Sequence, residues 1–189
     1  MSLLALEAVA LIRGGRLLFE GVSLRLNAGG AAVIRGPNGV GKSSLMRVAA
    51  GLLRASAGAV TRAGRIALAD EAAALDGKLT LSQALGFWAR LDGGRLADGM
   101  APMGLDRLAD VPVRMLSTGQ RKRAALARVV ASGAPIWLLD EPANGLDADG
   151  QDRLAAAMAA HRAAGGAVLA ATHQPIGLDG AQELVLGTA

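Results

Sequence analysis

The order of apolar and polar positions predicts short strands at the start of the chain. Apolar runs separated by turns occupy residues 8–12, 17–19 and 22–26. The last run alternates apolar with polar residues, which is the pattern of a half-buried strand. We expect residues 3–27 to form a small antiparallel layer, followed by two further short strands near residues 59–60 and 66–68.

The pattern changes to helical spacing over residues 79–115. Apolar residues recur there at intervals of three and four, which places them on one face of a helix, at Leu81, Ala84, Leu85, Trp88 and Leu91. Thr80 and Ser82 are both suited to cap the start of such a helix. Glycines and prolines interrupt the region, so we expect residues 71–115 to form a helical subdomain within a single domain of residues 1–189.

Helical and strand patterns alternate in the second half of the chain. Continuous apolar runs at residues 136–139 and 167–170 are typical of buried strands. Helical patterns end near Arg128 and span residues 149–164. This alternation predicts an α/β fold with a largely parallel sheet that helices cover on both faces.

A phosphate-binding loop follows a predicted strand at residues 31–34. It has the spacing G-x-x-x-x-G-K-S, and a helical pattern begins directly after it. The glycines allow backbone N–H groups to face phosphates, Lys42 can reach the β- and γ-phosphates, and the Ser43 hydroxyl can ligate Mg²⁺. We therefore expect ATP and Mg²⁺ to bind here, at Gly36, Pro37, Asn38, Gly39, Val40, Gly41, Lys42, Ser43 and Ser44.

Two carboxylates, Asp140 and Glu141, end the apolar run at residues 136–139. Ligands of open α/β sheets bind at the carboxyl ends of such strands. We expect Asp140 to hold Mg²⁺ together with Ser43, and Glu141 to polarise the water that attacks the γ-phosphate. The combination predicts an ATP hydrolase that works by positioning and charge stabilisation, without a covalent intermediate.

Composition narrows the classes of partner. The net charge is +4, but the basic residues are scattered and aromatic residues make up 2% of the chain, so we expect no nucleic-acid partner. The absence of cysteine excludes disulfides and thiolate metal sites. The chain starts without a secretory signal pattern and has no apolar run near the roughly 20 residues that span a membrane. Any membrane location would therefore depend on a partner.

Further motifs accompany the phosphate-binding loop and the carboxylate pair. Residues 116–120 read Leu-Ser-Thr-Gly-Gln, Asp147 follows the carboxylate pair, and His173 follows the last apolar run. Taken together and in this order, the motifs resemble the ATP-binding-cassette family over nearly the whole chain. The resemblance implies a P-loop ATPase fold with a RecA-like parallel sheet, an antiparallel β layer and a helical subdomain.

The same resemblance implies a site shared between two cassettes that pair head to tail. Each cassette would present its signature residues to the γ-phosphate bound by the other, through Ser117, Thr118, Gly119 and Gln120. His173 would act as a switch at the γ-phosphate, and Asp147, in the D-loop, would communicate across the dimer.

The chain departs from the family pattern in three places. Thr118 replaces the first glycine of the usual signature pair, a change that we do not expect to inactivate the protein. The glutamine that usually follows the strand at residues 65–69 is missing, which leaves Asp70 or Glu71 as substitutes. The aromatic residue that stacks on adenine is also missing. Arg13 stands near its place, where the guanidinium could stack on the base or simply lie exposed in the turn.

Within the family, the chain resembles the ATP-binding subunits of the haem exporter of bacterial cytochrome c maturation. This resemblance rests on the short chain, the basic residues after the signature, the Thr-His-Gln-Pro motif at residues 172–175, and the segment 78–85 with Phe87 and Trp88 soon after. These aromatic residues could be core residues or part of a partner-facing surface.

This resemblance implies a peripheral subunit on the cytoplasmic face of the bacterial inner membrane, bound to integral membrane permease subunits. It would drive haem export or release of haem from a chaperone without touching haem itself. Two alternatives are the ATPase subunit of another ABC transporter with a different substrate, and a soluble ABC ATPase without a permease.

Overall fold

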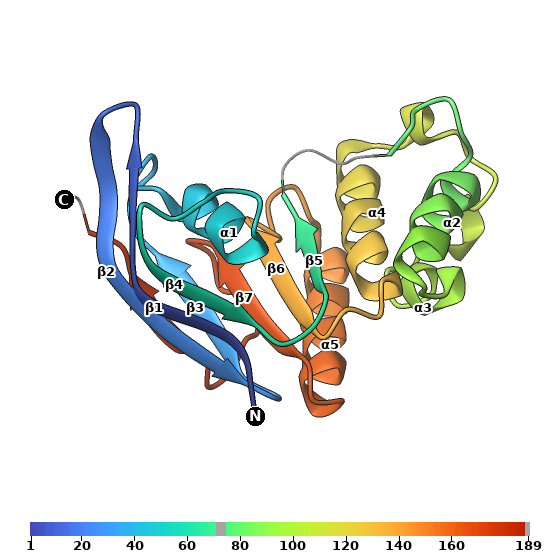
Figure 1. Ribbon diagram of the computed structural model, residues 1–189. Helices are drawn as coiled ribbons and strands as arrows, with labels where there is room; N and C mark the ends of the chain where they lie inside the picture. Colours follow the sequence, from blue (N-terminus) through green and yellow to red (C-terminus); the bar gives the residue numbers. More distant parts are fainter. Residues whose placement is uncertain (71–74, 188–189) are drawn as a thin grey trace.

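The computed structural model describes residues 1–70 and 75–187. Its first sheet is antiparallel, in the order β2-β1-β4 (Figure 1). β1 (Ser2–Arg13) and β2 (Arg16–Asn27) form a hairpin, and β4 (Ala57–Arg62) pairs with the other edge of β1. The expected antiparallel layer is confirmed, but the runs at residues 17–19 and 22–26 belong to one strand instead of two.

The second sheet is fully parallel and has the order β5-β6-β7-β3-β8. Its strands are β3 (Ala31–Arg35), β5 (Ile66–Ala69), β6 (Ile136–Asp140), β7 (Ala167–Ala171) and β8 (Gln182–Val185). The predicted parallel sheet is therefore confirmed. The sequence pattern did not indicate β8, because this edge strand is mostly exposed and carries polar residues.

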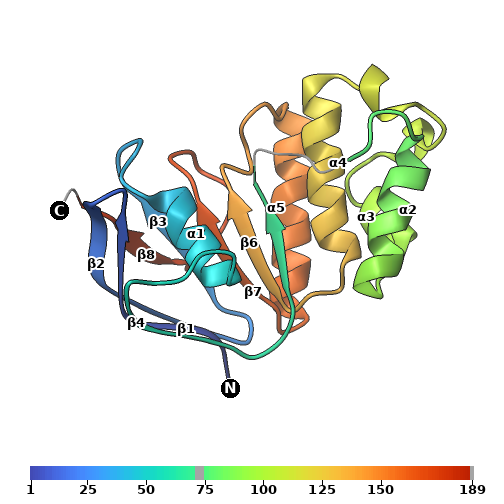
Figure 2. The same ribbon diagram turned by 45° about the horizontal axis from the view of Figure 1, so that its top comes forward.

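Helices cover both faces of the parallel sheet (Figure 1 and Figure 2). α1 (Lys42–Ala50) packs between the two sheets, whereas α4 (Thr118–Ala131) and α5 (Ala148–Ala163) pack on the opposite face. Alternate side chains of β6 serve the two layers: Ile136 packs toward α1, and its neighbour Trp137 packs toward α4 and α5. The strand is apolar throughout because both of its faces are buried.

The predicted helical region contains α2 (Leu81–Asp92), α3 (Leu96–Met100) and two 3₁₀ turns (Asp106–Leu108 and Val113–Met115). Thr80 caps α2 through a capping box with Gln83. The expectation that Leu91 shares the buried face was wrong, because Leu91 is 66% exposed. At about 100° per residue, Leu91 is turned roughly 80° from Leu81 and lies at the edge of that face.

The two aromatic residues of α2 have different environments. The Arg128 guanidinium of α4 lies 3.5 Å from the ring centroid of Trp88, which is a cation–π contact between two helices. Phe87 meets Trp88 edge to face, with ring centroids 5.3 Å apart, and is 52% exposed. Trp88 is therefore held within the chain, whereas Phe87 faces outward.

Candidate nucleotide-binding site

The loop between β3 and α1 packs closely against neighbouring backbone and side chains. Gly36 has a φ of 143°, and a Cβ placed there would lie 2.5 Å from the carbonyl oxygen of Leu186. Gly41 has a φ of 112°, and a Cβ there would lie 3.1 Å from the ring of Phe19. Glycine alone fits these two positions without displacing the neighbours.

The N-terminus of α1 provides positive charge at this loop. Lys42 is the first residue of the helix, and its ammonium group donates to the carbonyl oxygens of Gly36 at 2.8 Å and Pro37 at 3.1 Å. The helix has no side-chain cap and no acidic residue in its first turn. Its free N–H groups and the positive end of its dipole would therefore stabilise a phosphate bound beside Lys42.

A pocket of about 380 Å³ opens at this loop and gathers residues from distant parts of the chain. Its lining residues are Leu18, Asn38, Gly39, Gly41, Lys42, Ser43, Ser44, Asp140, Glu141, Asn144 and His173. β6 and β7 are parallel neighbours, so the residues that follow them meet at the carboxyl edge of the sheet. Of the other predicted loop residues, Val40 is buried in the core beneath the loop.

Glu141 has an uncommon backbone conformation for a non-glycine residue. Its φ is 44°, and its N–H donates to the carbonyl oxygen of Ala171 at 2.8 Å. The side chain is 13% exposed, and Oε1 lies 3.2 Å from Nδ1 of His173. Oε2 is buried and has no hydrogen-bond partner within the described residues. Backbone strain of this kind clusters at functional sites, and here it aims the carboxylate at the pocket.

A polar pair that the sequence analysis did not identify joins the loop after β6 to the segment after β7. Gln174 Nε2 donates to Asn144 Oδ1 at 3.2 Å, and Gln174 N donates to Thr172 Oγ1 at 3.1 Å. Arg35 Nη1 donates to the carbonyl oxygen of Thr172 at 2.8 Å. These contacts fix the two loops that carry the acidic and imidazole groups of the pocket. The sequence signal that could have identified Asn144 is its position as a polar residue soon after the carboxylate pair.

The predicted signature residues form the start of α4. Ser117 Oγ accepts from Gln120 N at 3.2 Å, and Gln120 Oε1 accepts from Ser117 N at 2.9 Å, which is a capping box. Asp147 caps α5, with Oδ1 accepting from Gly150 N at 2.8 Å. None of the predicted signature and D-loop residues is among the described residues that line the pocket at Lys42.

Arg13 ends β1 at the exposed hairpin turn. It is not among the described residues that line the pocket, whereas Leu18 of β2 is. Stacking of Arg13 on adenine therefore stays a prediction, and Leu18 is an apolar residue beside the phosphate-binding loop that the sequence analysis missed.

Asp70, one of the two candidates for the missing glutamine, does not line the pocket at Lys42. Asp70 lines a separate pocket of about 450 Å³ between the parallel sheet, α2 and α4, together with Trp88 and Arg128. Burial lowers the pKa of the Arg128 guanidinium, and the charges of Asp92 and Asp70 oppose this lowering. Glu71 lies outside the described residues.

The donor set fits a magnesium ion that accompanies a nucleotide. Asp140 is buried at the end of β6 and lines the same pocket as Ser43. The described residues contain no cluster of three or more His, Cys, Asp or Glu side chains that could hold a metal by themselves. Mg²⁺ beside a triphosphate needs few protein ligands, because phosphate oxygens and water fill most of its octahedral shell. Ser43 and Asp140 are therefore sufficient candidates.

Comparisons with known proteins agree with this geometry. A protein family described as "ABC transporter" matches residues 19–144. A protein of Sphingopyxis alaskensis named "Cytochrome c biogenesis ATP-binding export protein CcmA" is 63% identical over 188 residues, which cover 98% of this chain and 97% of the relative. A protein of the same name from Novosphingobium aromaticivorans is 57% identical over 178 residues, covering 94% of this chain and 92% of the relative.

The fold also matches a solved structure described as "Structure of ATP binding subunit of ABC transporter". The TM-score is 0.87, with 22% identity, over 97% of this chain and 85% of the other. This likeness confirms the predicted P-loop ATPase architecture. With the family match and the near full-length relatives, it leads to one conclusion: the chain belongs to the ABC transporter family, as an ATP-binding member.

Proposed function

We propose that this chain is the ATP-binding and hydrolysing subunit of an ABC transporter complex that drives haem export, or release of haem from a chaperone, in cytochrome c biogenesis. The observation that carries the ATPase assignment is the single pocket that gathers Lys42, Asp140, Glu141 and His173. The near full-length similarity to proteins named for cytochrome c biogenesis supports the process.

The pocket residues have distinct roles in this proposal. Lys42 and the N-terminus of α1 bind the β- and γ-phosphates, since both place positive charge at the loop. Glu141 orients and polarises the attacking water, and His173 contacts the γ-phosphate. Ser43 and Asp140 would hold Mg²⁺, which neutralises phosphate charge when bound. Each protein group is fixed before the reaction, so little reorganisation is needed as charge develops.

A second cassette completes the site. Ser117 and Gly119 lie at the N-terminus of α4 and do not line the pocket at Lys42. We propose that they bind the γ-phosphate held by a second copy in a head-to-tail dimer, with Thr118 and Gln120 beside them. The two-fold arrangement gives each ATP one loop and one signature, and Asp147 lies where the two copies communicate.

The membrane partner would be a set of integral permease subunits. No helix within the described residues is long and apolar enough to cross a membrane. Leu52 lines the pocket of about 450 Å³, and Phe87 and Leu91 are the chain neighbours of its lining residues Trp88 and Asp92 in α2. All three are large, exposed apolar side chains, which suits contact with another protein. We propose that this surface docks on the permease, and that the subunit is peripheral to the cytoplasmic face of the inner membrane.

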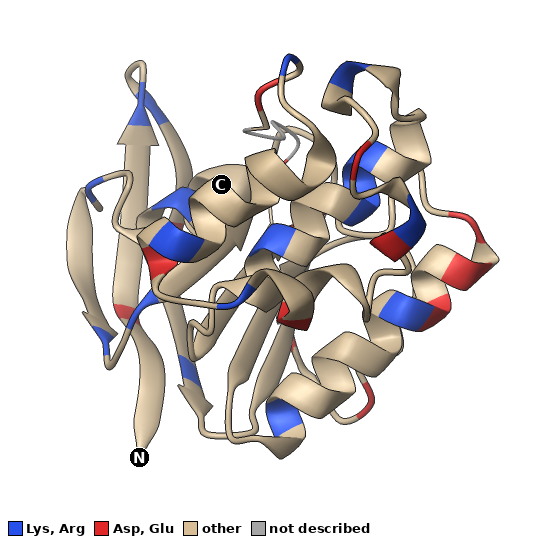
Figure 3. Ribbon diagram, turned by 90° about the vertical axis from the view of Figure 1, so that its right-hand side faces the viewer, with Lys and Arg blue, Asp and Glu red and all other residues tan. Residues whose placement is uncertain are grey.

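The same proposal covers the domain organisation of the chain and the absence of nucleic-acid and haem binding. Residues 1–189 are proposed to be one nucleotide-binding domain, with residues 71–115 as its helical subdomain. Basic positions are spread over strands and helices and are interspersed with acidic ones (Figure 3), so the charge pattern does not favour nucleic acid. Haem would be handled by the membrane partners and not by this chain.

Gene replacement in the native host tests the proposal. Lys42→Ala should abolish formation of haem-bound c-type cytochromes, measured by haem staining of membrane fractions, while the protein is still produced. Lys78→Ala is the matched control, because Lys78 lies in an exposed turn away from the pocket. Normal cytochrome c levels in the Lys42→Ala strain would refute the assignment to cytochrome c biogenesis.

A further inference from the structure

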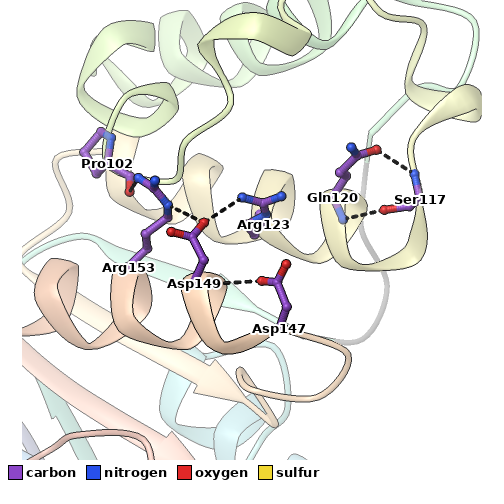
Figure 4. Close-up of polar contacts among 8 residues, drawn as sticks. Pro102, Ser117, Gln120, Arg123, Asp147, Asp149 and Arg153 are labelled. Carbon is purple, nitrogen blue, oxygen red and sulfur yellow. Dashed lines mark hydrogen bonds and ion pairs between the residues drawn. The ribbon is translucent and has the colours of Figure 1, made fainter.

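The helix that begins with the signature and the helix that begins with Asp147 are joined by one carboxylate. Asp149 lies in the first turn of α5, and its Oδ2 accepts from Arg153 Nε at 2.8 Å (Figure 4). The same oxygen lies 3.4 Å from Nη1 of Arg123, which belongs to α4. Asp149 therefore bridges the N-terminal parts of α4 and α5.

Arg153 extends this link to the helical region. Its Nη1 donates to the carbonyl oxygen of Pro102 at 3.4 Å. The guanidinium also packs on the turn at Gly104, where a Cβ would lie 2.8 Å from the Arg153 Cζ. α4, α5 and the turn after α3 thus converge on the Asp149–Arg153 pair (Figure 4).

The loops in front of the two helices also touch. A Cβ placed on Gly119 would lie 3.0 Å from the carbonyl oxygen of Gly145, in the loop that leads to Asp147. A Cβ on Gly145 would lie 3.9 Å from Cγ2 of Thr118. The signature and the segment before α5 are therefore in close contact, and a small rotation of α4 against α5 would change both.

We infer that Asp149 is a positioning residue for the shared ATP site: it fixes the start of α4 against the start of α5, so that the signature is presented correctly to the second cassette. This inference rests on the proposed ATPase function. The Asp149 side chain is 58% exposed, so its ion pairs stabilise the fold little. Small displacements of groups that contact a reacting phosphate can nevertheless slow the reaction strongly.

Asp149→Asn removes the charge and keeps the shape. Asp152→Asn is the matched control, because Asp152 is exposed on the same helix and no ion pair is described for it. Both variants are compared with the wild-type chain in nucleotide affinity, kcat and KM for ATP, and ATP-driven pairing measured in the Glu141→Gln background. Asp149→Glu, which keeps the charge, serves as the rescue variant.

The inference predicts that Asp149→Asn lowers kcat about three- to tenfold and weakens pairing, while nucleotide affinity stays within about twofold. Asp149→Glu should recover most of the loss. If Asp149→Asn matches Asp152→Asn in kcat and pairing, the inference is wrong while the proposed function stands. If the wild-type chain neither hydrolyses ATP nor pairs with ATP, the proposed function fails and the inference fails with it.

Discussion

Oε1 of Glu141 lies 3.2 Å from Nδ1 of His173, although the two residues are 32 positions apart in the sequence. They meet because β6 and β7 are parallel neighbours that end at the same edge of the sheet. The contact orients the carboxylate and the imidazole toward one pocket, where Lys42 also lies. The predicted base and the predicted switch therefore form one unit.

Glu141→Gln should lower kcat at least about 100-fold, because an amide cannot accept a proton from the attacking water. Nucleotide affinity should change little, since Lys42 and the loop remain in place. Steady-state ATPase assays and binding of a fluorescent ATP analogue measure the two quantities. Glu20→Gln, at an exposed position of β2, controls for the loss of a carboxylate. Hydrolysis by Glu141→Gln at the wild-type rate would show that another group is the base.

His173→Ala should lower kcat at least about tenfold, because it removes the proposed contact to the γ-phosphate and frees the Glu141 carboxylate. The double variant Glu141→Gln/His173→Ala should be hardly slower than Glu141→Gln alone, since residues that act as a unit are not additive. Single-turnover hydrolysis of all three variants checks this. Fully multiplicative losses would mean that the two residues act independently.

Lys42→Ala should weaken ATP binding at least about tenfold, because it removes the ammonium group from the phosphate-binding loop. Lys42 also donates to the carbonyl oxygens of Gly36 and Pro37, so melting curves must confirm that the variant is folded. Titration calorimetry with a non-hydrolysable ATP analogue gives the affinities. Lys78→Ala should bind as the wild type does, and equal affinity in both variants would disprove the predicted role of Lys42.

Two glycine positions in the helical region should respond in opposite directions to alanine. Gly99→Ala should destabilise the chain by about 2 kcal/mol or more, because its Cβ would lie 2.1 Å from the carbonyl oxygen of Ala127 in α4. Gly86→Ala, in α2, should stabilise the chain by about 0.5–1 kcal/mol, since the nearest atom to its Cβ would be Nη1 of Arg90 at 3.5 Å, an ordinary contact distance. Urea unfolding followed by circular dichroism distinguishes them. Equal effects would mean that α3 does not pack on α4 in this way.

His161 should make the fold sensitive to acid. Its ring stacks on Trp137 with centroids 3.8 Å apart, and burial lowers the pKa of the imidazole below its ordinary value. A lowered pKa means that the unfolded chain binds the proton first, so stability should be lost as the pH falls below about 6.5. His161→Phe keeps the stacking ring and should show a smaller loss between neutral and mildly acidic pH. An unchanged pH profile of the unfolding free energy would contradict this.

The buried strands and the phosphate-binding loop could be predicted from the sequence. β6 and β7 are apolar on both faces, and the phosphate-binding loop has fixed spacing, so both the parallel sheet and the pocket at Lys42 could be predicted. The loops after these parallel strands were expected to lie close together, because parallel strands end at the same edge of a sheet.

Features that depend on tertiary contact could not be read in this way. β8 is an exposed edge strand with polar residues, so no apolar period marks it. Leu91 fits the helical period but lies at the edge of the buried face. The pair of Asn144 and Gln174 exists because β6 and β7 adjoin, which short-range spacing does not reveal.

The most direct test of the proposed function is to identify the proteins that bind this chain in its native host. A tagged Glu141→Gln chain would be trapped with ATP and purified from gently solubilised membranes, and the proteins that accompany it would be identified by mass spectrometry, with an untagged chain as the control. We predict recovery of integral membrane proteins of cytochrome c biogenesis with the tagged chain and not with the untagged one. Recovery of a different permease would contradict the haem assignment, and a purely soluble partner would contradict the transporter function itself.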